Sequence, residues 1–279
     1  MTNIIDGKQL AQNILEHVKN DTTSLIRAGV SPRLAVVFVG HNGPSRTYIK
    51  RKKEAAEYVQ IMCDVHRFDE DISENTLIQK IQDIQSDDSV HGIIVQLPLS
   101  KHLDTHTILN TLDPDKDVDC MTDKNMGKLV TETNILCPPT PLAVLTILDN
   151  IHAEIKGKNI TIVGAGALVG KPLAIMLVNK QATVTICNEF TTDLKKKTQK
   201  ADILITAVGK KDLITKDMVK KGVIMIDTGI AFEHKKMYGD VDFLHVAPKS
   251  SYITPTPGGI GPITVSLLLA NVVHCAKHI

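Results

Sequence analysis

A short apolar run that ends among closely spaced glycines constrains this chain more than any other feature. Residues 159–172 read NITIVGAGALVGKP, so a predicted strand enters a loop and the loop enters a helix. The loop glycines are Gly164, Gly166 and Gly170. Glycines allow a tight turn whose backbone approaches a pyrophosphate, and the helix N-terminus adds N–H donors. We therefore predict dinucleotide binding here, with a purely structural glycine turn as the alternative.

Strand-like and helix-like segments alternate along the rest of the chain. Apolar runs predict strands at 33–39, 62–68, 92–96, 159–163, 183–187, 203–207 and 223–227. Helical patterns occupy 44–59, 75–85, 142–151 and 261–277, and an amphipathic helix is expected near the N-terminus. Such alternation is typical of parallel sheets with crossover helices. We expect an α/β protein with two βα domains around a cleft, the second a Rossmann-like parallel sheet.

The expected domain boundary follows a segment with weak periodicity, residues 111–141, which we interpret as a long and partly irregular connection. The first domain is expected to span 1–140. The second is expected to span 141–261.

Composition excludes several classes of protein. The 279 residues carry a formal net charge of +1 and only 3% aromatic residues, which argues against a nucleic-acid-binding surface. No apolar run approaches the roughly 20 residues of a membrane helix, and the first residues do not resemble a signal peptide. The five cysteines are scattered without a C-x-x-C pair, which favours reduced thiols in a cytoplasmic protein.

A second candidate site lies at residues 44–53, which read PSRTYIKRKK. Ser45, Tyr48 and Lys52 are three and four positions apart, so they share one face of a predicted helix. This helix follows a buried strand, where ligands of open α/β sheets bind. Burial would lower the pKa of Lys52 and allow acid/base catalysis near neutral pH. The alternative is a solvated basic helix face.

Two further strand ends carry polar residues that suit a nucleotide. Glu189 follows the predicted strand 183–187, where a carboxylate can accept hydrogen bonds from an adenosine ribose and would repel a 2′-phosphate. Taken alone it favours NAD over NADP, unless it is a surface carboxylate that caps the next helix. The sequence Asp227-Thr228-Gly229 ends another strand, and it either contacts the nicotinamide half or forms a turn.

Several motifs follow one another in a fixed order along nearly the whole chain. They are SRTYxxxK at 45–52, VQLPL at 95–99, DKDVD at 115–119, PPTP at 138–141, GxxxxVGxP at 164–172 and YITPTPGGIGPITV at 252–265. This set resembles the bifunctional methylenetetrahydrofolate dehydrogenase/cyclohydrolase family. The Pro-Gly-Gly-x-Gly-Pro segment is the most specific part of the match.

The resemblance implies an enzyme of one-carbon metabolism. It implies oxidation of 5,10-methylenetetrahydrofolate by NAD(P)⁺ to the 5,10-methenyl cation, followed by hydrolysis of that cation to 10-formyltetrahydrofolate. The first domain, completed by a C-terminal helix at 262–279, would bind the folate, and the second domain would bind the nucleotide, for which NADP is the usual family cofactor. A cytoplasmic homodimer that pairs through the nucleotide domain is implied, without a metal, a nucleic acid or a membrane as partner.

The resemblance also assigns residues. Lys52 would act as the acid and base, Gln96 would orient it, Tyr48 would stack on the folate and Asp119 would accept hydrogen bonds from the pterin. The remaining substrate-binding residues would be Leu97, Pro257, Gly258, Gly259 and Ile260. The nucleotide would be bound by Gly164, Ala165, Gly166, Gly170, Glu189, Gly209, Thr228, Gly229 and Ile230. Turn formation is the alternative role for Asp119.

Three departures from the family pattern leave alternatives open. Cys120 replaces the usual glycine after the aspartate motif, and Pro139 replaces a cysteine. A dehydrogenase that has lost cyclohydrolase activity, or a silent folate- or nucleotide-binding protein, remains possible on these two changes. Ala165 and Glu189 stand where NADP-using members have basic residues, so we expect weakened selectivity for NADP.

One further pair of residues suggests a metal. His102 and His106 are one helical turn apart, but the glutamate of a zinc protease motif is missing. We expect surface histidines here rather than metal ligands.

Overall fold

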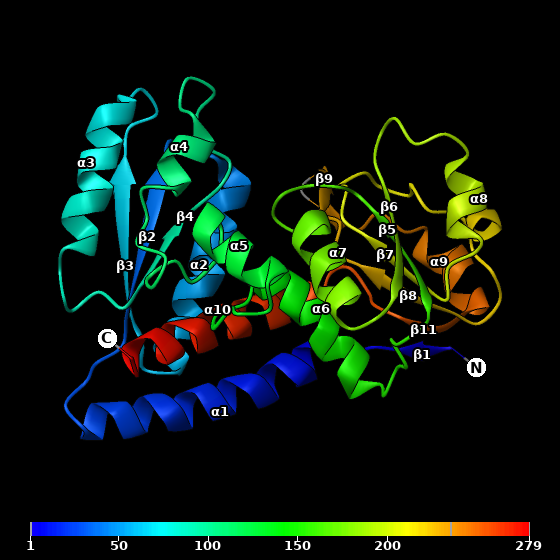
Figure 1. The fold of residues 1–279 in the computed structure, drawn as a ribbon, viewed down its shortest axis with the longest axis horizontal. Coiled ribbons are helices and arrows are strands. Elements are labelled where there is room, and N and C mark those ends of the chain that lie inside the picture. The colour runs from blue at the N-terminus through cyan, green and yellow to red at the C-terminus, as the bar shows by residue number, and fades with distance from the viewer. Residues whose placement is uncertain (1, 235, 279) are drawn as a thin grey trace. The chain divides into compact units, whose positions relative to one another are not determined.

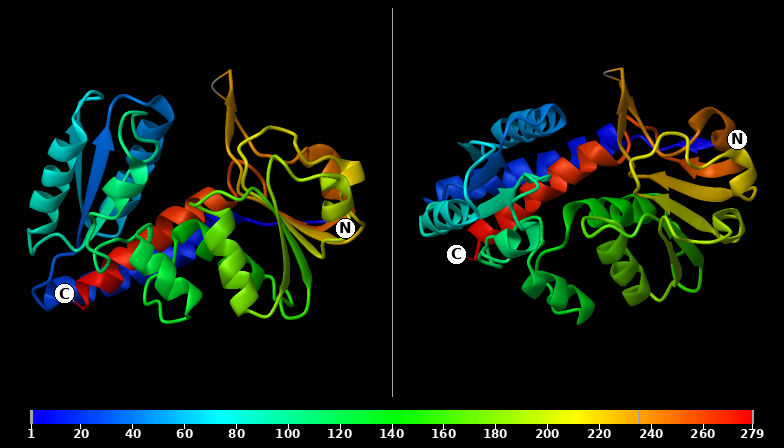
Figure 2. Two further views of the ribbon diagram at one scale, coloured as in Figure 1. Left: turned by 45° about the horizontal axis from the view of Figure 1, so that its top comes forward. Right: turned by 90° about the horizontal axis from the view of Figure 1, so that it is seen from above.

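The computed structural model describes residues 2–234 and 236–278. The chain forms two compact units, one built from residues up to 11 with 140–264 and the other from 12–139 with 265 onward. Each unit has its own parallel sheet (Figures 1 and 2). Three helices continue from one unit into the other along the chain: α1 (Gly7–Arg27), α6 (Pro139–Asn150) and α10 (Ile260–Ala276).

The second unit, residues 12–139 with 265 onward, contains a three-stranded sheet in the order β3-β2-β4. Its elements are β2 (Arg33–Val39), α2 (Gly43–Tyr58), β3 (Met62–Phe68), α3 (Glu74–Gln85), β4 (Gly92–Val95), α4 (Thr105–Leu109) and α5 (Asp123–Val130). The strands pair in parallel. The predicted strands and the helices α2 and α3 are therefore present within one or two residues of the expected bounds.

Burial of β2 on both faces explains its unbroken apolar sequence. Leu34, Val36 and Phe38 pack in one hydrophobic cluster with residues of α1, α2 and α10. The alternate residues, Ala35 and Val37 among them, pack on the other face with residues of α3 and α4. A parallel strand covered on both faces needs apolar side chains at every position.

The segment 111–141 is more ordered than its weak periodicity predicted. It contains α5, and the side chain of Thr122 caps this helix by accepting a hydrogen bond from the Asn125 amide. The helix has only eight residues. Such a short helix gives little periodic signal, so its cap was the better sequence evidence.

The first unit, residues up to 11 with 140–264, contains a six-stranded sheet in the order β1-β11-β8-β7-β5-β6. Its strands are β1 (Asn3–Ile4), β5 (Asn159–Val163), β6 (Thr183–Cys187), β7 (Ile203–Thr206), β8 (Val223–Asp227) and β11 (Ser250–Ile253), all paired in parallel. The helices are α7 (Gly170–Asn179), α8 (Leu194–Thr198) and α9 (Phe243–Val246), with 3₁₀ turns at Lys216–Met218 and Ala247–Lys249. An antiparallel pair, β9 (Ala231–Glu233) and β10 (Lys236–Tyr238), follows β8. The predicted Rossmann-like parallel sheet is confirmed.

The N-terminal residues differ from the expected division of the chain. The expected folate-binding domain was to begin at residue 1. Instead β1 pairs with β11 of the six-stranded sheet, and the Ile5 amide donates to the Ile253 carbonyl at 2.9 Å. Residues up to 11 therefore belong with the six-stranded sheet. A two-residue strand leaves no readable pattern, which is why the sequence did not predict this pairing. No helix in the described chain is both long and apolar enough to cross a bilayer.

Candidate active site

Lys52 lies on α2 and reaches the end of β4. The helix starts at a capped turn, where the Asn42 side chain accepts a hydrogen bond from the Ser45 amide. Lys52 Nζ donates to Gln96 Oε1 at 3.2 Å. Gln96 is fixed in turn, because its amide donates to Val37 O at 2.8 Å and its Nε2 donates to Leu97 O at 2.9 Å. The structure thus brings Lys52 and Gln96 together, as the sequence predicted.

The charge state of Lys52 depends on opposing influences. Burial is the largest and lowers the pKa of the ammonium group, because it removes the charged form from water. The carboxylate of Asp119 opposes this shift by charge. Asp119 is therefore close enough to the Lys52 amine to influence it by charge. Burial raises the pKa of the nearby Cys63 thiol, so this thiol is uncharged at neutral pH. Cys63, on β3, was not predicted as a neighbour, because a single cysteine outside any motif carries no sequence signal.

Tyr48 lies one helical turn before Lys52 on α2. Its hydroxyl oxygen is buried and has no hydrogen-bond partner within the described chain. Burial raises the pKa of this hydroxyl, opposed by the nearby charge of Arg51, so the phenol stays protonated at neutral pH. A buried hydroxyl without a partner is available to a bound ligand.

Asp119 projects from a turn whose other residues are buried. Residues 116–118 and 120 are almost fully buried, whereas Asp119 is partly exposed. The Cys120 amide donates to Asp117 O at 3.1 Å, and Asn271 on α10 donates to Val118 O at 2.8 Å. The backbone on both sides of Asp119 is therefore anchored, and its carboxylate is the group left to interact outside the turn.

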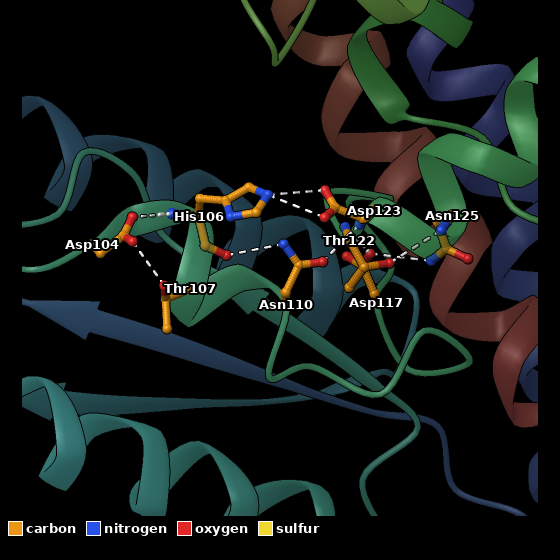
Figure 3. A network of polar contacts seen from close by, with 8 residues as sticks. All are labelled: Asp104, His106, Thr107, Asn110, Asp117, Thr122, Asp123 and Asn125. Atoms are coloured by element: carbon orange, nitrogen blue, oxygen red, sulfur yellow. Dashed lines mark hydrogen bonds and ion pairs between the residues drawn. The ribbon is translucent and has the colours of Figure 1, made fainter.

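A polar network holds the turn that carries Asp119, through the neighbouring residue Asp117 (Figure 3). Oδ2 of the buried Asp117 accepts hydrogen bonds from the Thr122 amide at 2.8 Å and from Asn125 Nδ2 at 3.1 Å. The network continues to the surface, where His106 Nε2 lies 3.1 Å from the Asp123 carboxylate. Asp117 and Asn125 were not predicted, because their role depends on contacts that only the folded turn creates.

The two histidines that suggested a metal are not on one helix. His102 precedes α4 and its Nε2 lies 3.0 Å from Ile72 O, whereas His106 pairs with Asp123. Among the described residues, no group of histidine, cysteine and acidic side chains is arranged to hold a metal ion.

The glycine loop between β5 and α7 has the predicted strand–turn–helix form. Gly164 has a φ of +117°, and a Cβ there would overlap the Ala207 carbonyl. A Cβ at Gly170 would overlap the Gly164 carbonyl, so this glycine allows the helix to pack against the loop. A Cβ at Gly166 would meet open space. No side chain caps the N-terminus of α7. Lys171 already donates its amide to Gly166 O at 3.0 Å, and Pro172 has no N–H, so an anion at this helix end would be bound by the Gly170 amide.

The other predicted nucleotide residues follow the carboxyl ends of neighbouring strands. Glu189 is exposed after β6, on a turn held by the Asn188 side chain, which accepts from the Phe190 amide at 3.0 Å. Gly209 follows β7 with a φ of +81°. Thr228, Gly229 and Ile230 follow β8. The sheet order places β6, β5, β7 and β8 side by side, so these loops share one edge of the sheet.

The expected folate residues of the Pro-Gly-Gly segment belong to the same unit as the glycine loop. Residues 257–260 connect β11 to the start of α10, and Gly258 has a φ of +107°. Pro257 is exposed, whereas Gly259 and Ile260 are buried. Their contact with folate stays a prediction.

Comparison with known proteins decides the family. Residues 5–119 match the catalytic domain of tetrahydrofolate dehydrogenase/cyclohydrolase, and residues 138–279 match its NAD(P)-binding domain. The chain belongs to the tetrahydrofolate dehydrogenase/cyclohydrolase family. The resemblance read from the sequence motifs is therefore confirmed.

Individual relatives of this family match over almost the full length. The bifunctional protein FolD of Nautilia profundicola is 47% identical over 276 residues, which cover 99% of this chain and 97% of that protein. The crystal structure of the FolD methylenetetrahydrofolate dehydrogenase/cyclohydrolase from Campylobacter jejuni has a TM-score of 0.97 and 43% identity, with 99% of both chains covered. The FolD of Trypanosoma brucei, complexed with NADP and an inhibitor, has a TM-score of 0.95 and 31% identity, covering 99% and 97% of the two chains.

The structure accommodates Cys120 and Pro139, the two residues that depart from the family motifs of the folate domain. Cys120 has a φ of +56°, in the left-handed region where glycine is favoured, which accounts for the usual family glycine. Its side chain is buried in the cluster that contains β2. Pro139 begins α6, a position that tolerates proline because the first helical N–H has no partner in the helix. Neither residue interrupts the Lys52–Gln96 contact.

Proposed function

We propose that this protein oxidises 5,10-methylenetetrahydrofolate to 5,10-methenyltetrahydrofolate with a nicotinamide dinucleotide and then hydrolyses the product to 10-formyltetrahydrofolate. The observation that carries this proposal is the partly buried amine of Lys52, which donates a hydrogen bond to Gln96 at 3.2 Å and lies within the electrostatic influence of Asp119. The retention of Tyr48, Lys52, Gln96 and Asp119 in one unit supports both activities and gives no support to a silent binding protein.

A Lys52 amine whose pKa is lowered by burial suits both steps. Loss of hydride leaves a cation delocalised over two folate nitrogens, and a charged ammonium group beside it would be unfavourable. In the hydrolysis, water adds to the one-carbon bridge while Lys52 Nζ takes a proton from it. The same amine then returns a proton to the departing ring nitrogen as the carbon–nitrogen bond breaks. The remaining hydroxyl proton of the adduct passes to solvent as the formyl C=O forms, so the hydrolysis releases one proton overall. Gln96 keeps Nζ at its place through both transfers.

The other site residues bind and orient the folate. Tyr48 would stack on the ring system and present its hydroxyl, which lacks a partner within the described chain. Asp119 would accept hydrogen bonds from the donor edge of the pterin. Leu97, next to Gln96, and residues 257–260 would complete the substrate contacts.

The nucleotide edge fits a dinucleotide. Gly166, with open space above its Cα, and the Gly170 amide at the start of α7 would receive the pyrophosphate. Ala165 and Gly170 would shape this loop, while Gly209, Thr228, Gly229 and Ile230 would lie along the nicotinamide side. When bound, NAD(P)⁺ accepts the hydride that the folate releases.

We propose weakened selectivity for NADP⁺, with NAD⁺ as an effective cofactor. The exposed Glu189 stands on a fixed turn after β6, where its carboxylate would accept from a ribose hydroxyl and repel a 2′-phosphate. No basic residue stands at Ala165. A kcat/KM for NADP⁺ far above that for NAD⁺ would refute this preference, and Glu189→Ser should shift the ratio toward NADP⁺.

We also propose a cytoplasmic homodimer paired through the nucleotide-binding unit. β6 ends the six-stranded sheet, and Ile186 on this strand and Val178 on α7 expose apolar side chains. An edge strand of this kind can pair with a second copy. Light scattering should give twice the mass of the chain, and Ile186→Lys should lower it.

The decisive experiment follows both reactions in one cuvette. Purified protein is mixed with methylenetetrahydrofolate and either NAD⁺ or NADP⁺, and the methenyl species is recorded. We expect nucleotide reduction without lasting accumulation of the methenyl species. Accumulation at the uncatalysed rate of hydrolysis would contradict the proposed cyclohydrolase, and no reduction of either nucleotide would contradict the dehydrogenase.

A further inference from the structure

A fully buried carboxylate lies beneath the nucleotide edge. Asp240 follows β10 and has no exposed surface. Its Oδ1 accepts hydrogen bonds from the Gly209 amide at 2.8 Å and the Lys210 amide at 2.7 Å, and its Oδ2 accepts from the Val208 amide at 2.8 Å. Three consecutive backbone N–H groups of the loop after β7 therefore point at one side chain.

A second buried carboxylate ties this arrangement to the loop after β8. Asp227 Oδ1 accepts from the Gly229 amide at 2.9 Å and from the Asp240 amide at 3.1 Å. The Thr206 hydroxyl, at the end of β7, donates to the same oxygen at 2.9 Å. The ends of β7 and β8 are thus connected through the two aspartates.

Close packing fixes the position of Asp240. A Cβ at Gly229 would overlap the Asp240 carboxylate, so the loop after β8 lies directly against it. Successive backbone N–H groups turned to one point form a concave anion site in many proteins. Here the anion is supplied by the chain itself. A buried carboxylate is costly unless it is well hydrogen-bonded, and three donors meet that need.

The loop that Asp240 holds carries residues assigned to the nucleotide. Gly209 lies within it, and Gly229 is the residue packed on the carboxylate. The Val208 side chain is 47% exposed, so the loop presents an apolar group to solvent while its N–H groups turn inward. Without the carboxylate, these N–H groups would have to turn toward water or another acceptor, and the loop would change shape.

We propose that Asp240 is a positioning residue for dinucleotide binding: its carboxylate holds residues 208–210 and Gly229 in the arrangement that receives the nucleotide. This inference rests on the proposed dehydrogenase function. It predicts that loss of the carboxylate weakens nucleotide binding while leaving the Lys52 site, in the other unit, able to hydrolyse its substrate.

The test compares Asp240→Asn with Asp242→Asn. Asparagine keeps the size of the side chain but turns one oxygen into an N–H donor, which opposes one or two of the loop amides. Asp242 is two residues away, partly exposed, and bonded to His245 instead. For Asp240→Asn we expect the KM for the better dinucleotide to rise by roughly tenfold or more. Asp242→Asn should leave this KM unchanged.

Hydrolysis of methenyltetrahydrofolate without nucleotide separates positioning from general damage. We expect Asp240→Asn to keep this activity within about twofold. An unchanged dinucleotide KM, or a parallel loss of hydrolysis, would overturn the proposal. If the unaltered protein reduces neither nucleotide, the proposed function fails instead, so the two failures are distinct.

A second pair of variants changes Lys210 in the loop after β7 and leaves Asp240 in place. Lys210→Pro removes one of the donated N–H groups, and Lys210→Ala removes the same side chain but keeps that N–H. The proposal predicts a higher dinucleotide KM for Lys210→Pro than for Lys210→Ala. Equal KM values would contradict it, even if Asp240→Asn failed to fold.

Discussion

Lys52 is a partly buried ionisable side chain and Asp240 a fully buried one, and their surroundings differ sharply. Within the described chain, Lys52 Nζ donates one hydrogen bond, to Gln96, and burial lowers its pKa. Asp240 accepts three backbone hydrogen bonds and has no exposed surface. The first group is left with capacity to exchange a proton, whereas both oxygens of the second are held by backbone N–H groups. The number of partners therefore distinguishes a site for chemistry from a site that shapes a loop.

Replacing Lys52 tests whether the amine with few partners is the group that carries out the chemistry. Lys52→Met should lower the hydrolysis of methenyltetrahydrofolate by roughly 10²-fold or more, the usual scale for loss of an acid/base group. Stability should not fall, because the amine has few partners to lose. Initial rates and thermal unfolding check both points.

Lys50→Met is the matched control for this variant. Lys50 lies on the same helix with an exposed side chain, 3.7 Å from Glu54, and its loss should leave the rate within about twofold. Unaltered hydrolysis in Lys52→Met would overturn the role of Lys52.

Asp227, the buried carboxylate next to Asp240, should make the free energy of unfolding depend on pH. Burial, together with the charge of Asp240, raises the pKa of Asp227 to about 6. Since the unfolded value is near 3.9, the folded chain keeps a proton that the unfolded chain has released between these pH values. The contribution of Asp227 to stability is therefore largest at low pH. It should decline by about 3 kcal/mol as the pH rises from about 4 to about 6, and then stay constant.

Denaturant unfolding of the unaltered protein and of Asp227→Asn checks this dependence. The difference in unfolding free energy between the two should vary over that pH range and level off above it. A difference that is constant from pH 4 to pH 7 would contradict the assignment.

A negative charge placed beside Lys52 should raise its pKa toward that of an exposed lysine. Gln96→Glu puts a carboxylate where an amide oxygen now lies 3.2 Å from Nζ, so the pKa of Lys52 should rise. Hydrolysis at pH 7 should fall by about tenfold and recover at higher pH. The pH–rate profile measures this shift. Gln82→Glu, exposed on α3, should leave the profile in place, and an unmoved profile in Gln96→Glu would count against the pKa argument.

The smallest effect is expected at Cys120. The left-handed conformation costs a non-glycine residue about 1–2 kcal/mol, and Cys120→Gly would relieve it. The glycine also loses a buried side chain and gains freedom in the unfolded state, which costs about as much. Denaturant unfolding should show a change within about 1 kcal/mol, with Asp119 still presented and hydrolysis retained. A loss of hydrolysis would show that the Cys120 side chain itself is needed.

Much of this architecture was predictable because its signals are local. The apolar sequence of β2, the glycine loop after β5 and the shared face of Tyr48 and Lys52 each follow from neighbouring residues. The pairing of β1 with β11 was not predictable, because it joins short segments from distant parts of the chain. The same holds for Asp240, whose three donors come from a loop some thirty residues earlier.

The Lys52 site was predicted from its motif, but its electrostatics were not. The sequence indicated a lysine near a strand end, and the structure adds the Gln96 acceptor and the opposing charge of Asp119. These partners come from the residue after β4 and from the turn at 117–120. A balance of burial against charge depends on all of them together, so the helix pattern alone could not give it.

The most direct test is a titration of the Lys52 amine itself. Protein labelled with ¹³C at lysine Cε would be titrated by NMR, with the Lys52 signal assigned by its absence in Lys52→Met. The account predicts that this one signal titrates at lower pH than that of the exposed Lys50. If the Lys52 signal titrates together with Lys50, the amine is charged and solvated at neutral pH, and the proposed acid/base role is contradicted.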